Sequence, residues 1–421
     1  MHSWKREIPY LQVNKIMGRS SVEISAVRNQ KLSSRKDFQM NFALTEEQKM
    51  VRDQVARFAE TEIKPIAAEL DRTHRHPEEI CRKLGSMGIM GVSVSTEYKG
   101  AGMDNVTYVL ALIAISKACA GTGAIVSVNN TLYGFPVKMY GTHEQKLKYL
   151  SPVAGGLVEG CYALTEAGAG SDAASLSCRA ELKGDKFIVN GTKRFITNGA
   201  VANYCVLAAT TDPGKGYKGI INLIVDLKNT PGFSIGKIEE KMGINASTTA
   251  ELIFEDAEIP AENLLGEPGH GFRQMLSSLD AGRIGIGAQA CGIGRAALED
   301  ALNYAKERVQ FGKPISTFQA IQFKLADMAT ELDAAEMLLL KAAWLEDNDM
   351  NYEKEAAMAK MYASDVAMRA SIEGVQVFGG YGYSKEYPAE RHMRDAKICQ
   401  IYEGTNEIMR VVIARKLLGE R

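Results

Sequence analysis

The sequence predicts an α+β protein in which a small antiparallel β-domain lies between two helical domains. Three observations predict this fold class. Apolar residues recur at helical spacing up to about residue 160, strand-like runs replace them to about residue 268, and long helical runs follow. Because helical and extended runs occupy separate blocks, the pattern does not indicate an alternating βαβ protein. The 421 residues suffice for several domains.

We place the domain boundaries where the periodicity changes. They give a leader or extension that we expect to be disordered, an N-terminal α-helical domain, a middle β-domain and a C-terminal four-helix bundle, at residues 1–40, 41–160, 161–268 and 269–421.

The segment before Met40 is basic, with eight Lys or Arg and three Asp or Glu in 39 residues. Its weak apolar periodicity offers no face to bury. It is either a mitochondrial transit peptide or an extension ahead of a start at Met40. We favour the extension, which predicts a cytoplasmic protein of bacterial type; a transit peptide would predict the mitochondrial matrix.

The first helical domain opens on a capping box. Thr45 is followed three residues later by Gln48, and apolar residues then repeat on one face as far as Pro65. Further helical runs are predicted at residues 77–89, 104–119 and 143–151.

The middle domain begins where the apolar period changes after Gly160. In Lys186–Thr197, two extended segments flank Asn190-Gly191, and an Asn-Gly pair between such segments is the strongest local signal for a β-hairpin. We therefore expect the chain to reverse there. Other strands are predicted near residues 204–208, 220–225 and 250–254.

The C-terminal domain reads as long helices joined by short loops, which favours antiparallel neighbours in a bundle. The sequence Gly285-Ile-Gly287-Ala-Gln-Ala290 matches the glycine pattern of a dinucleotide-binding turn. It lies inside a helical run with no strand before it, so we expect close helix packing instead. The helices are predicted near residues 272–309, 317–347, 353–378, 388–400 and 406–419.

Composition excludes several classes of function. The formal net charge of −1 gives no reason to expect nucleic acid or an anionic membrane as partner. No apolar run reaches the roughly 18 residues of a membrane-spanning helix. The seven cysteines are scattered without a CxxC pair, which favours reduced thiols inside a cell. His74 and His76 are the only close histidine pair, and no third ligand is near in the sequence, so we predict no metal site.

The strongest catalytic candidate is Glu403, which lies between two predicted helices. Gly404 permits an unusual backbone angle, and Thr405 can cap the helix that begins at Asn406. The helix N-terminus favours the charged carboxylate, whereas burial would raise its pKa. This combination suits a general base, although a glutamate at a helix start can also be a surface feature only.

The sequence around Glu403 also resembles that of a known protein family. The sequence Ile401-Tyr-Glu-Gly-Thr-Asn-Glu-Ile408, after Met393-Arg-Asp-Ala-Lys-Ile398, resembles the C-terminal signature of the acyl-CoA dehydrogenases. Further motifs follow in the family's order from about residue 41 to 418. The resemblance implies an FAD enzyme in which Glu403 removes the α-proton of an acyl-CoA, yielding a trans-2-enoyl-CoA. A few relatives carry this glutamate at the position of Gly282. Because that residue is a glycine here, the resemblance leaves Glu403 as the candidate base.

The resemblance also assigns cofactor residues. It places the loop after residue 162 along the flavin, Thr197 at flavin N5, Phe195 as a shield where many members have Trp, and Arg308 in a neighbouring subunit's FAD site. The full set is Tyr162, Ala163, Leu164, Thr165, Ser171, Phe195, Ile196, Thr197, Arg308, Phe311, Gln319, Gln376, Gly379, Gly380, Thr405 and Glu407.

For the substrate, the resemblance assigns Ser171, Asp280, Arg283 and Gly404. Asn245 stands where a basic residue is common. The implied partners are an acyl-CoA, an electron-transfer flavoprotein and three further copies in a homotetramer. Several segments, such as Asp280–Ile286, are most similar to the corresponding segments of the short-chain, butyryl-CoA branch of the family. Three alternatives stay open: an oxidase that uses dioxygen, a branched-chain acyl-CoA dehydrogenase, and a silent acyl-CoA-binding scaffold.

Overall fold

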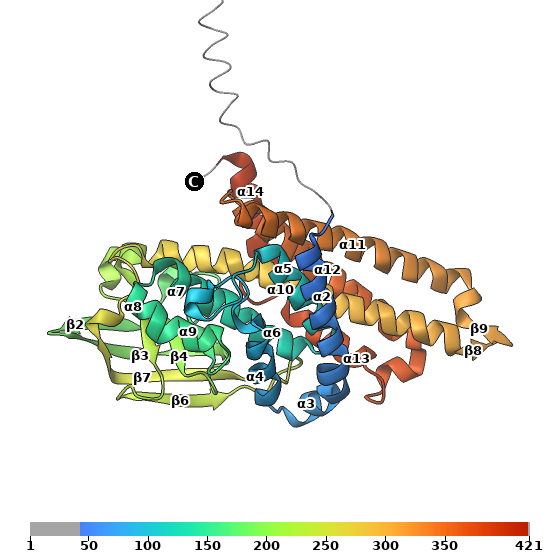
Figure 1. Cartoon of the computed structure of the whole chain (residues 1–421), viewed down its shortest axis with the longest axis horizontal. Coiled ribbons are helices and arrows are strands. Elements are labelled where there is room, and N and C mark those ends of the chain that lie inside the picture. The colour runs from blue at the N-terminus through green and yellow to red at the C-terminus, as the bar shows by residue number, and fades with distance from the viewer. Residues whose placement is uncertain (1–42, 420–421) are drawn as a thin grey trace, which may run out of the picture. The chain divides into compact units, whose positions relative to one another are not determined.

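The computed structural model describes residues 43–419. Residues from Glu46 onward form one compact unit. In this unit the β-sheet lies at one end and the longest helices extend toward the other (Figure 1). The fold class is confirmed: helices precede and follow a β-sheet region. The leader predicted at residues 1–40 lies outside the described residues.

The N-terminal region is helical, as predicted, but it has more helix than expected. The segment 120–140, which the sequence reading left without helix, is helical almost throughout. All nine residues of Ala120–Val128 are buried, so this segment has no polar face and no amphipathic period to detect. The α-helices are α2 (Glu46–Phe58), α3 (Ala67–Thr73), α4 (Glu78–Ser86), α5 (Asn105–Ala118), α6 (Ala120–Val128), α7 (Phe135–Tyr140), α8 (His143–Gln145) and α9 (Ser151–Ala154).

The middle region forms one seven-stranded sheet with the order β1-β4-β2-β3-β7-β6, and β5 pairs with β4. Most neighbours are antiparallel, as expected, but β1 and β2 each pair with β4 in parallel. One face packs on a core that includes Val189, Leu207 and Phe254. The strands are β1 (Gly160–Ala163), β2 (Arg179–Lys183), β3 (Lys186–Thr197), β4 (Tyr204–Thr210), β5 (Ile220–Asp226), β6 (Phe233–Ile238) and β7 (Thr249–Pro260).

The predicted hairpin at Asn190-Gly191 is wrong, because β3 continues through both residues. The chain reverses earlier, where β2 Lys183 pairs with β3 Lys186. Asn190 exchanges two hydrogen bonds with Asp256 of β7, of 3.0 and 2.8 Å, beside an irregularity in the β3–β7 register. The Asn-Gly pair therefore lies at a β-bulge and not in a turn.

The C-terminal helices match their predicted ranges to within two residues. Ion pairs join them: Arg295 to Glu336 at 2.7 Å and Arg369 to Glu331 at 3.1 Å. The rejected dinucleotide motif lies inside α10, where a Cβ at Gly285 would come within 2.7 Å of the Tyr108 hydroxyl. The helices are α10 (Gly271–Glu307), α11 (Gln319–Asp347), α12 (Glu353–Phe378), α13 (Ala389–Ile398) and α14 (Asn406–Leu418).

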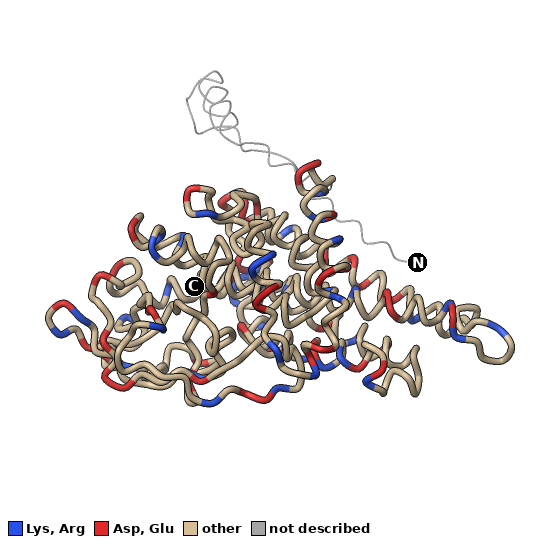
Figure 2. Tube along the Cα trace, turned by 60° about the horizontal axis from the view of Figure 1, so that its bottom comes forward, with Lys and Arg blue, Asp and Glu red and all other residues tan. Residues whose placement is uncertain are grey.

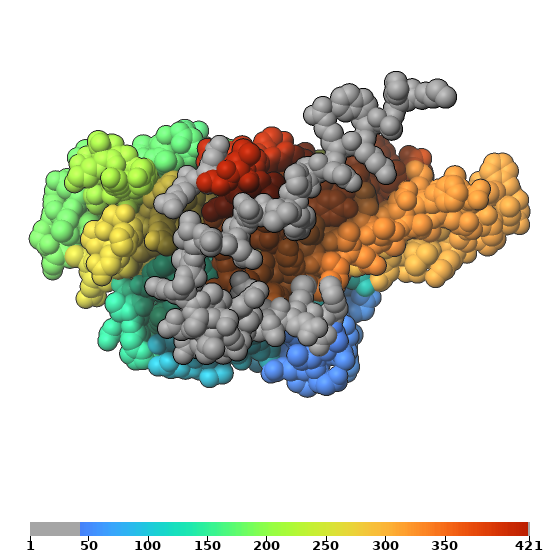
Figure 3. Space-filling view, turned by 90° about the horizontal axis from the view of Figure 1, so that it is seen from above, coloured from blue at the N-terminus to red at the C-terminus, as the bar shows by residue number. Residues whose placement is uncertain are grey.

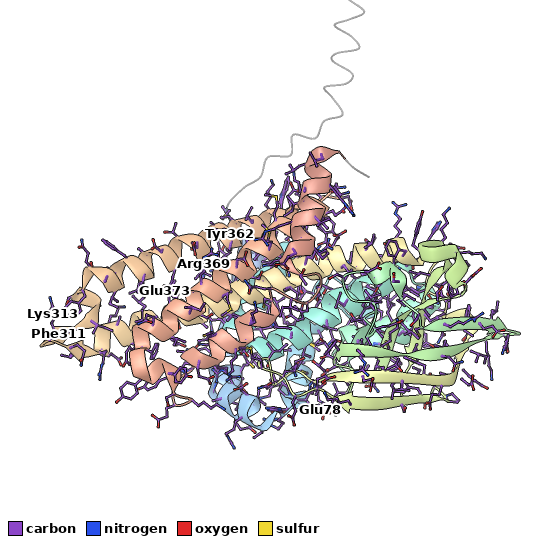
Figure 4. The ribbon with its side chains drawn as sticks, turned by 180° about the vertical axis from the view of Figure 1, so that it is seen from behind. Glu78, Phe311, Lys313, Tyr362, Arg369 and Glu373 are labelled. Atoms are coloured by element: carbon purple, nitrogen blue, oxygen red, sulfur yellow. The ribbon has the colours of Figure 1, made fainter. Side chains whose placement is uncertain are left out.

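Between α10 and α11 the chain forms a two-stranded hairpin of β8 (Val309–Gln310) and β9 (Lys313–Pro314). We call residues 308–319 the arm. It lies at the end of the helices farthest from the sheet (Figure 1), and Phe311 and Lys313 project at its tip (Figure 4). Phe311 is 94% exposed.

The last helix is only partly packed in a single chain. Of α14, only Asn406 and Met409 are buried, while Leu417 and Leu418 are 70% and 74% exposed. Figure 3 shows the C-terminal residues, in red, at the surface. Ile408 and Val412 are half-buried, so the described residues of the same chain cover the first half of this helix better than its end.

Charges of both signs are scattered along the described part of the trace (Figure 2), in keeping with the small net charge. Among residues 43–419, no helix is both long and apolar enough to cross a membrane. All seven cysteines are buried and free.

Candidate active site

The candidate active site is centred on the turn between α13 and α14. We call residues 399–405 the hinge. Glu403 has a φ of 55° and Gly404 a φ of 97°, a conformation that is strained for the glutamate and easy for the glycine. The Thr405 hydroxyl accepts a hydrogen bond from the Ile408 N–H at 3.4 Å. Thr405 is thus the N-cap of α14, as predicted.

The Glu403 carboxyl group points into the molecule, toward α10. Its Oε2 is buried and has no hydrogen-bond partner among the described residues. It lies so close to Gly282 that a Cβ at that position would overlap it. A few relatives carry their glutamate at the position of Gly282. In this chain the missing side chain of Gly282 leaves the space in which the Glu403 carboxyl lies.

The expected opposition of burial and charge is present at Glu403. Burial raises the pKa of this carboxyl to about 8, against the opposing charges of Lys360 and Arg283. A buried carboxyl without hydrogen bonds has a strong tendency to take up a proton. The site therefore has the chemistry that a general base needs near neutral pH.

Asp280 and Arg283 form an ion pair on α10, at 2.5 Å, with the guanidinium almost fully buried. The Arg283 Nε has no partner in the described part of the chain. Burial raises the pKa of Asp280 to about 6, although Arg283 opposes this. The pair is thus a helical ion pair that still leaves one buried donor unused.

A second group of predicted residues lies in the loop after β1. Tyr162, Ala163 and Leu164 are buried, Thr165 is half-buried and Ser171 is exposed. Beyond Thr165, ideal Cβ atoms at Gly168 and Gly170 would meet nothing within 4 Å. The loop is therefore packed at its root and open beyond it.

An ion pair that sequence reasoning missed fixes this root. The Lys193 Nζ, fully buried in β3, lies 2.7 Å from the Glu166 carboxylate and donates to the Leu164 carbonyl at 2.9 Å. The next residue, Arg194, donates its backbone N–H to the Thr165 carbonyl at 2.8 Å. These bonds place the loop beside β3. The available signal was a lysine at an inward position of a strand, which requires a buried partner.

Phe195 projects from β3 beside that loop. Its φ of 57° turns the ring outward at a register irregularity of β3, and the residue is 61% exposed. The neighbouring Ile196 is buried, and Thr197 pairs with Thr249 of β7. A large apolar ring that the chain leaves uncovered is a suitable wall for a flat ligand.

Leu132 connects the loop to the hinge. It packs against the apolar cluster that contains Tyr162 and Leu164, and it also lies beside Gly282. Leu132 thus connects the β1 loop to Gly282 and Glu403, while the Arg194 N–H connects the same loop to the strand that carries Phe195.

The other predicted cofactor residues lie elsewhere. Arg308, Gly379 and Gly380 line an open groove of about 560 Å³ at the base of the arm, with Tyr381 5.5 Å from the Arg308 guanidinium. Phe311, Gln319 and Gln376 are exposed nearby in the sequence. This group is at the end of the unit opposite the sheet (Figure 1). A single chain does not bring the two predicted groups together.

His76 has two potential co-ligands in space, Cys81 and Glu159, whereas His74 is not part of this group. Potential ligand atoms of His76, Cys81 and Glu159 lie within 4.8 Å of one another. The His76 Nε2 and the Glu159 Oε1 lie 2.7 Å apart, at hydrogen-bond distance, and link the segment before α4 to the segment before β1.

These features outline a site with a buried carboxyl oxygen, an open loop and a flat apolar wall. Models of three acyl-CoA dehydrogenase domains match the chain, the N-terminal domain at residues 45–157, the middle domain at 161–257 and the C-terminal domain at 269–418. The chain belongs to the acyl-CoA dehydrogenase family, whose members are FAD-dependent oxidoreductases. The boundaries that we placed at residues 160 and 268 stay predictions.

Individual relatives cover almost all of the described chain. The short-chain specific acyl-CoA dehydrogenase of Clostridium acetobutylicum is 49% identical over 378 residues, 90% of this chain and 100% of that protein. The butyryl-CoA dehydrogenase structure from Megasphaera elsdenii is 45% identical with a TM-score of 0.88, over 90% of this chain and 100% of that one. A chain from a study of the electron transferring flavoprotein of Acidaminococcus fermentans is 51% identical with a TM-score of 0.89, with the same coverage.

Proposed function

We propose that this protein oxidises a short-chain acyl-CoA to the trans-2-enoyl-CoA, with Glu403 as the base that removes the α-proton. One observation carries the proposal: the Glu403 Oε2 is buried against Gly282 and has no hydrogen-bond partner within residues 43–419. An unpaired buried carboxyl is costly for a fold and therefore calls for a function. The short-chain and butyryl-CoA relatives support the substrate class.

Glu403 must be deprotonated before it can accept a proton. With a pKa of about 8 in the free protein, roughly a tenth of the molecules hold the carboxylate at pH 7. The charges of Arg283 and Lys360 favour that form. The same low-polarity surroundings that raise the pKa also make the carboxylate a strong base once it has formed.

The residues of the β1 loop and β3 fit FAD. The open glycines 168 and 170 leave room for close backbone approach, the Thr165 and Ser171 hydroxyls can bind polar edges, and Phe195 offers a flat wall. Held by these residues, FAD would supply the acceptor for the hydride that leaves Cβ of the substrate. Thr197 would donate a hydrogen bond to flavin N5, while Thr405 and Glu407 would border the cofactor from the hinge side.

Polarising the thioester falls to the backbone of the hinge. The Glu403 N–H would donate to the thioester carbonyl as negative charge develops there, and Gly404 leaves space for that approach. Arg283, with its unused Nε, and its partner Asp280 would bind the CoA arm together with Ser171. The proton taken from Cα stays on Glu403 until the enoyl product leaves.

The arm supports assembly as part of the proposal. Arg308, Phe311 and Gln319, with Gln376, Gly379 and Gly380, would reach the FAD of a neighbouring copy, so that each complete site takes residues from two chains of a homotetramer. Arg308 supplies the positive charge that a pyrophosphate needs. The strong exposure of the arm favours this reading over a packing role in its own chain.

The proposed electron acceptor is an electron-transfer flavoprotein, and the similarity to a chain studied with such a protein supports it. Location stays a prediction, cytoplasmic rather than mitochondrial, because residues 1–42 lie outside the described structure.

The test is the flavin absorbance of the purified protein after anaerobic addition of butyryl-CoA. We expect bleaching, then rapid recovery with an electron-transfer flavoprotein and slow recovery in air. Fast recovery in air alone would instead identify an oxidase. A protein without flavin, or one that no acyl-CoA bleaches, would overturn the proposal, and bleaching by isovaleryl-CoA in preference to butyryl-CoA would move it to the branched-chain class.

A further inference from the structure

Lys360 is a fully buried lysine in the middle of α12, directed at the hinge. Its exposed fraction is 0%, and within residues 43–419 no carboxylate forms an ion pair with it. Its ammonium donates to the Gly404 carbonyl at 2.7 Å and to the Asn406 Oδ1 at 3.0 Å. A buried charge without a counter-ion is expensive to maintain, and a surface position would avoid that expense.

Both acceptors belong to the segment that carries Glu403. Gly404 directly follows it, and Asn406 is the first residue of α14. The Asn406 amide in turn donates to Ser364 at 2.9 Å and to Asp365 at 2.8 Å, both on α12. One helix therefore holds the C-terminal end of the hinge through three adjacent side chains.

The strain in the hinge explains why such an anchor is needed. Glu403 and Gly404 both have positive φ, and a non-glycine residue keeps that conformation only when its surroundings over-determine it. On the N-terminal side, Tyr402 donates its hydroxyl to Gln289 of α10, and its N–H bonds the Ile398 carbonyl at 3.1 Å. Lys360 supplies the matching restraint on the C-terminal side.

From this geometry we propose that Lys360 is a positioning residue for Glu403. Its ammonium fixes the Gly404 carbonyl, which keeps the Glu403 carboxyl turned toward Gly282, and its positive charge acts on that carboxyl. The inference rests on the proposed role of Glu403 as the base, but it concerns a different residue and a different measurable quantity.

Other charges near the hinge do not supply the same effect. Arg283 also faces Glu403, but Asp280 pairs with it at 2.5 Å and offsets its charge. Within residues 43–419, Lys360 has no such partner. The titratable groups that face Lys360 from the elements around it are Arg283 of α10, Asp365 of α12, Cys399 and Glu403 of the hinge, and Glu407 of α14.

The direction of the pKa shifts agrees with this geometry. Burial lowers the pKa of Lys360 to about 8, with Glu403 among the groups that oppose the shift. Burial raises the pKa of Glu403, and Lys360 is the largest opposing charge. Removing the ammonium should therefore raise the pKa of Glu403 further.

The test compares Lys360→Met, which removes both the charge and the hydrogen bonds, with Lys360→Gln, which removes the charge but can still donate to Gly404. Ser371→Ala is the matched control, since Ser371 is a fully buried serine on the same helix that bonds only the Met368 carbonyl. The readout is the carboxylic-acid infrared band of the flavin-loaded protein, assigned to Glu403 by its absence in Glu403→Gln and followed against pH.

We expect the midpoint of that band to rise by about one pH unit in both Lys360 variants, a tenfold change in proton affinity, and to stay unchanged in Ser371→Ala. The rate of flavin bleaching by butyryl-CoA at pH 7 should fall about tenfold in Lys360→Gln and further in Lys360→Met, which also lacks the anchor.

An unchanged midpoint in a flavin-loaded Lys360 variant would overturn the proposal. If Lys360→Met does not fold, Lys360→Gln decides the question alone. The infrared titration needs no turnover, so a protein that fails to oxidise any acyl-CoA would contradict the proposed function and still leave the Lys360 measurement interpretable.

Discussion

The hinge and the arm share one backbone feature and differ in everything around it. Glu403 in the hinge and Phe311 in the arm both have a positive φ, of 55° and 53°. The Glu403 carboxyl oxygen Oε2 is buried, and α10 and α12 of the same chain hold the segment around it. Phe311 is 94% exposed, at the tip of a two-stranded hairpin.

The difference teaches which part of the site one chain can complete. Strained residues persist where surroundings support them, and the hinge has that support within its own chain. The arm exposes a strained aromatic residue next to a groove in which Gly379 and Gly380 have open space. We infer that a single chain is enough to position Glu403, whereas the part of the cofactor site at the arm depends on a second copy.

The largest effect is expected from the hinge. Glu403→Gln keeps the volume of the side chain but cannot accept the α-proton, so turnover should fall about a thousandfold or more while FAD and acyl-CoA still bind. Steady-state kinetics with butyryl-CoA measure this. The control is Glu331→Gln, which removes an ion pair between α11 and α12. Turnover of Glu403→Gln within tenfold of the parent would refute the assignment.

The arm should respond in a different quantity. Arg308→Ala removes the proposed cation for the FAD pyrophosphate, and losing a charge-assisted hydrogen bond of about 1.5–3 kcal/mol weakens binding roughly 10- to 100-fold. FAD release and the tetramer population, followed together by fluorescence and sedimentation, should change in parallel. Lys313→Ala is the control, a cation of the same hairpin that lies over the Phe318 ring. A fully flavinated monomer would break the comparison between the two regions.

The pH dependence should also belong to the hinge alone. Because Glu403 acts as the carboxylate and its pKa is about 8, kcat/KM should rise with pH, change about tenfold per unit below that value, and level off above it. Asp280, with a pKa of about 6, titrates at lower pH. The rising limb should be the same in Arg308→Ala. A profile flat from about pH 6 to about pH 9, a range over which the carboxylate fraction should rise roughly a hundredfold, would show that another group is the base.

The same contrast explains what the sequence could predict. Predictions that depend on residues close together in the sequence are confirmed. These are the Thr405 cap, the C-terminal helices and the absence of a dinucleotide-binding turn at Gly285–Ala290. Features that join distant residues were missed or misread, such as Lys360 at Gly404 and Lys193 at Glu166. The Asn190-Gly191 hairpin failed for this reason too, since Asn190 bonds Asp256 of another strand. Local propensity cannot anticipate such partners.

Acyl-chain preference should give the smallest effect, and it too should be set by the hinge side. Beyond Gly282 and Glu403 along α10, the next small residue, Gly285, is covered by Ser127 and by the Tyr108 hydroxyl. Both covering residues are buried, so a longer chain directed that way would have to displace packed side chains. Each methylene that finds room contributes about 0.8 kcal/mol, roughly fourfold in affinity, whereas forcing one into packed surroundings costs about 1–3 kcal/mol. Specificity constants should therefore peak at about four to six carbons, because the gain per methylene turns into a loss there.

Competition kinetics with butyryl-, hexanoyl-, octanoyl- and isovaleryl-CoA measure the peak, and Arg308→Ala should lower all four constants without moving it. A maximum at octanoyl-CoA or at the branched substrate would contradict the short-chain proposal while leaving Glu403 as the base, and a maximum that moved in Arg308→Ala would mean that the arm, and not the hinge side alone, shapes the acyl site.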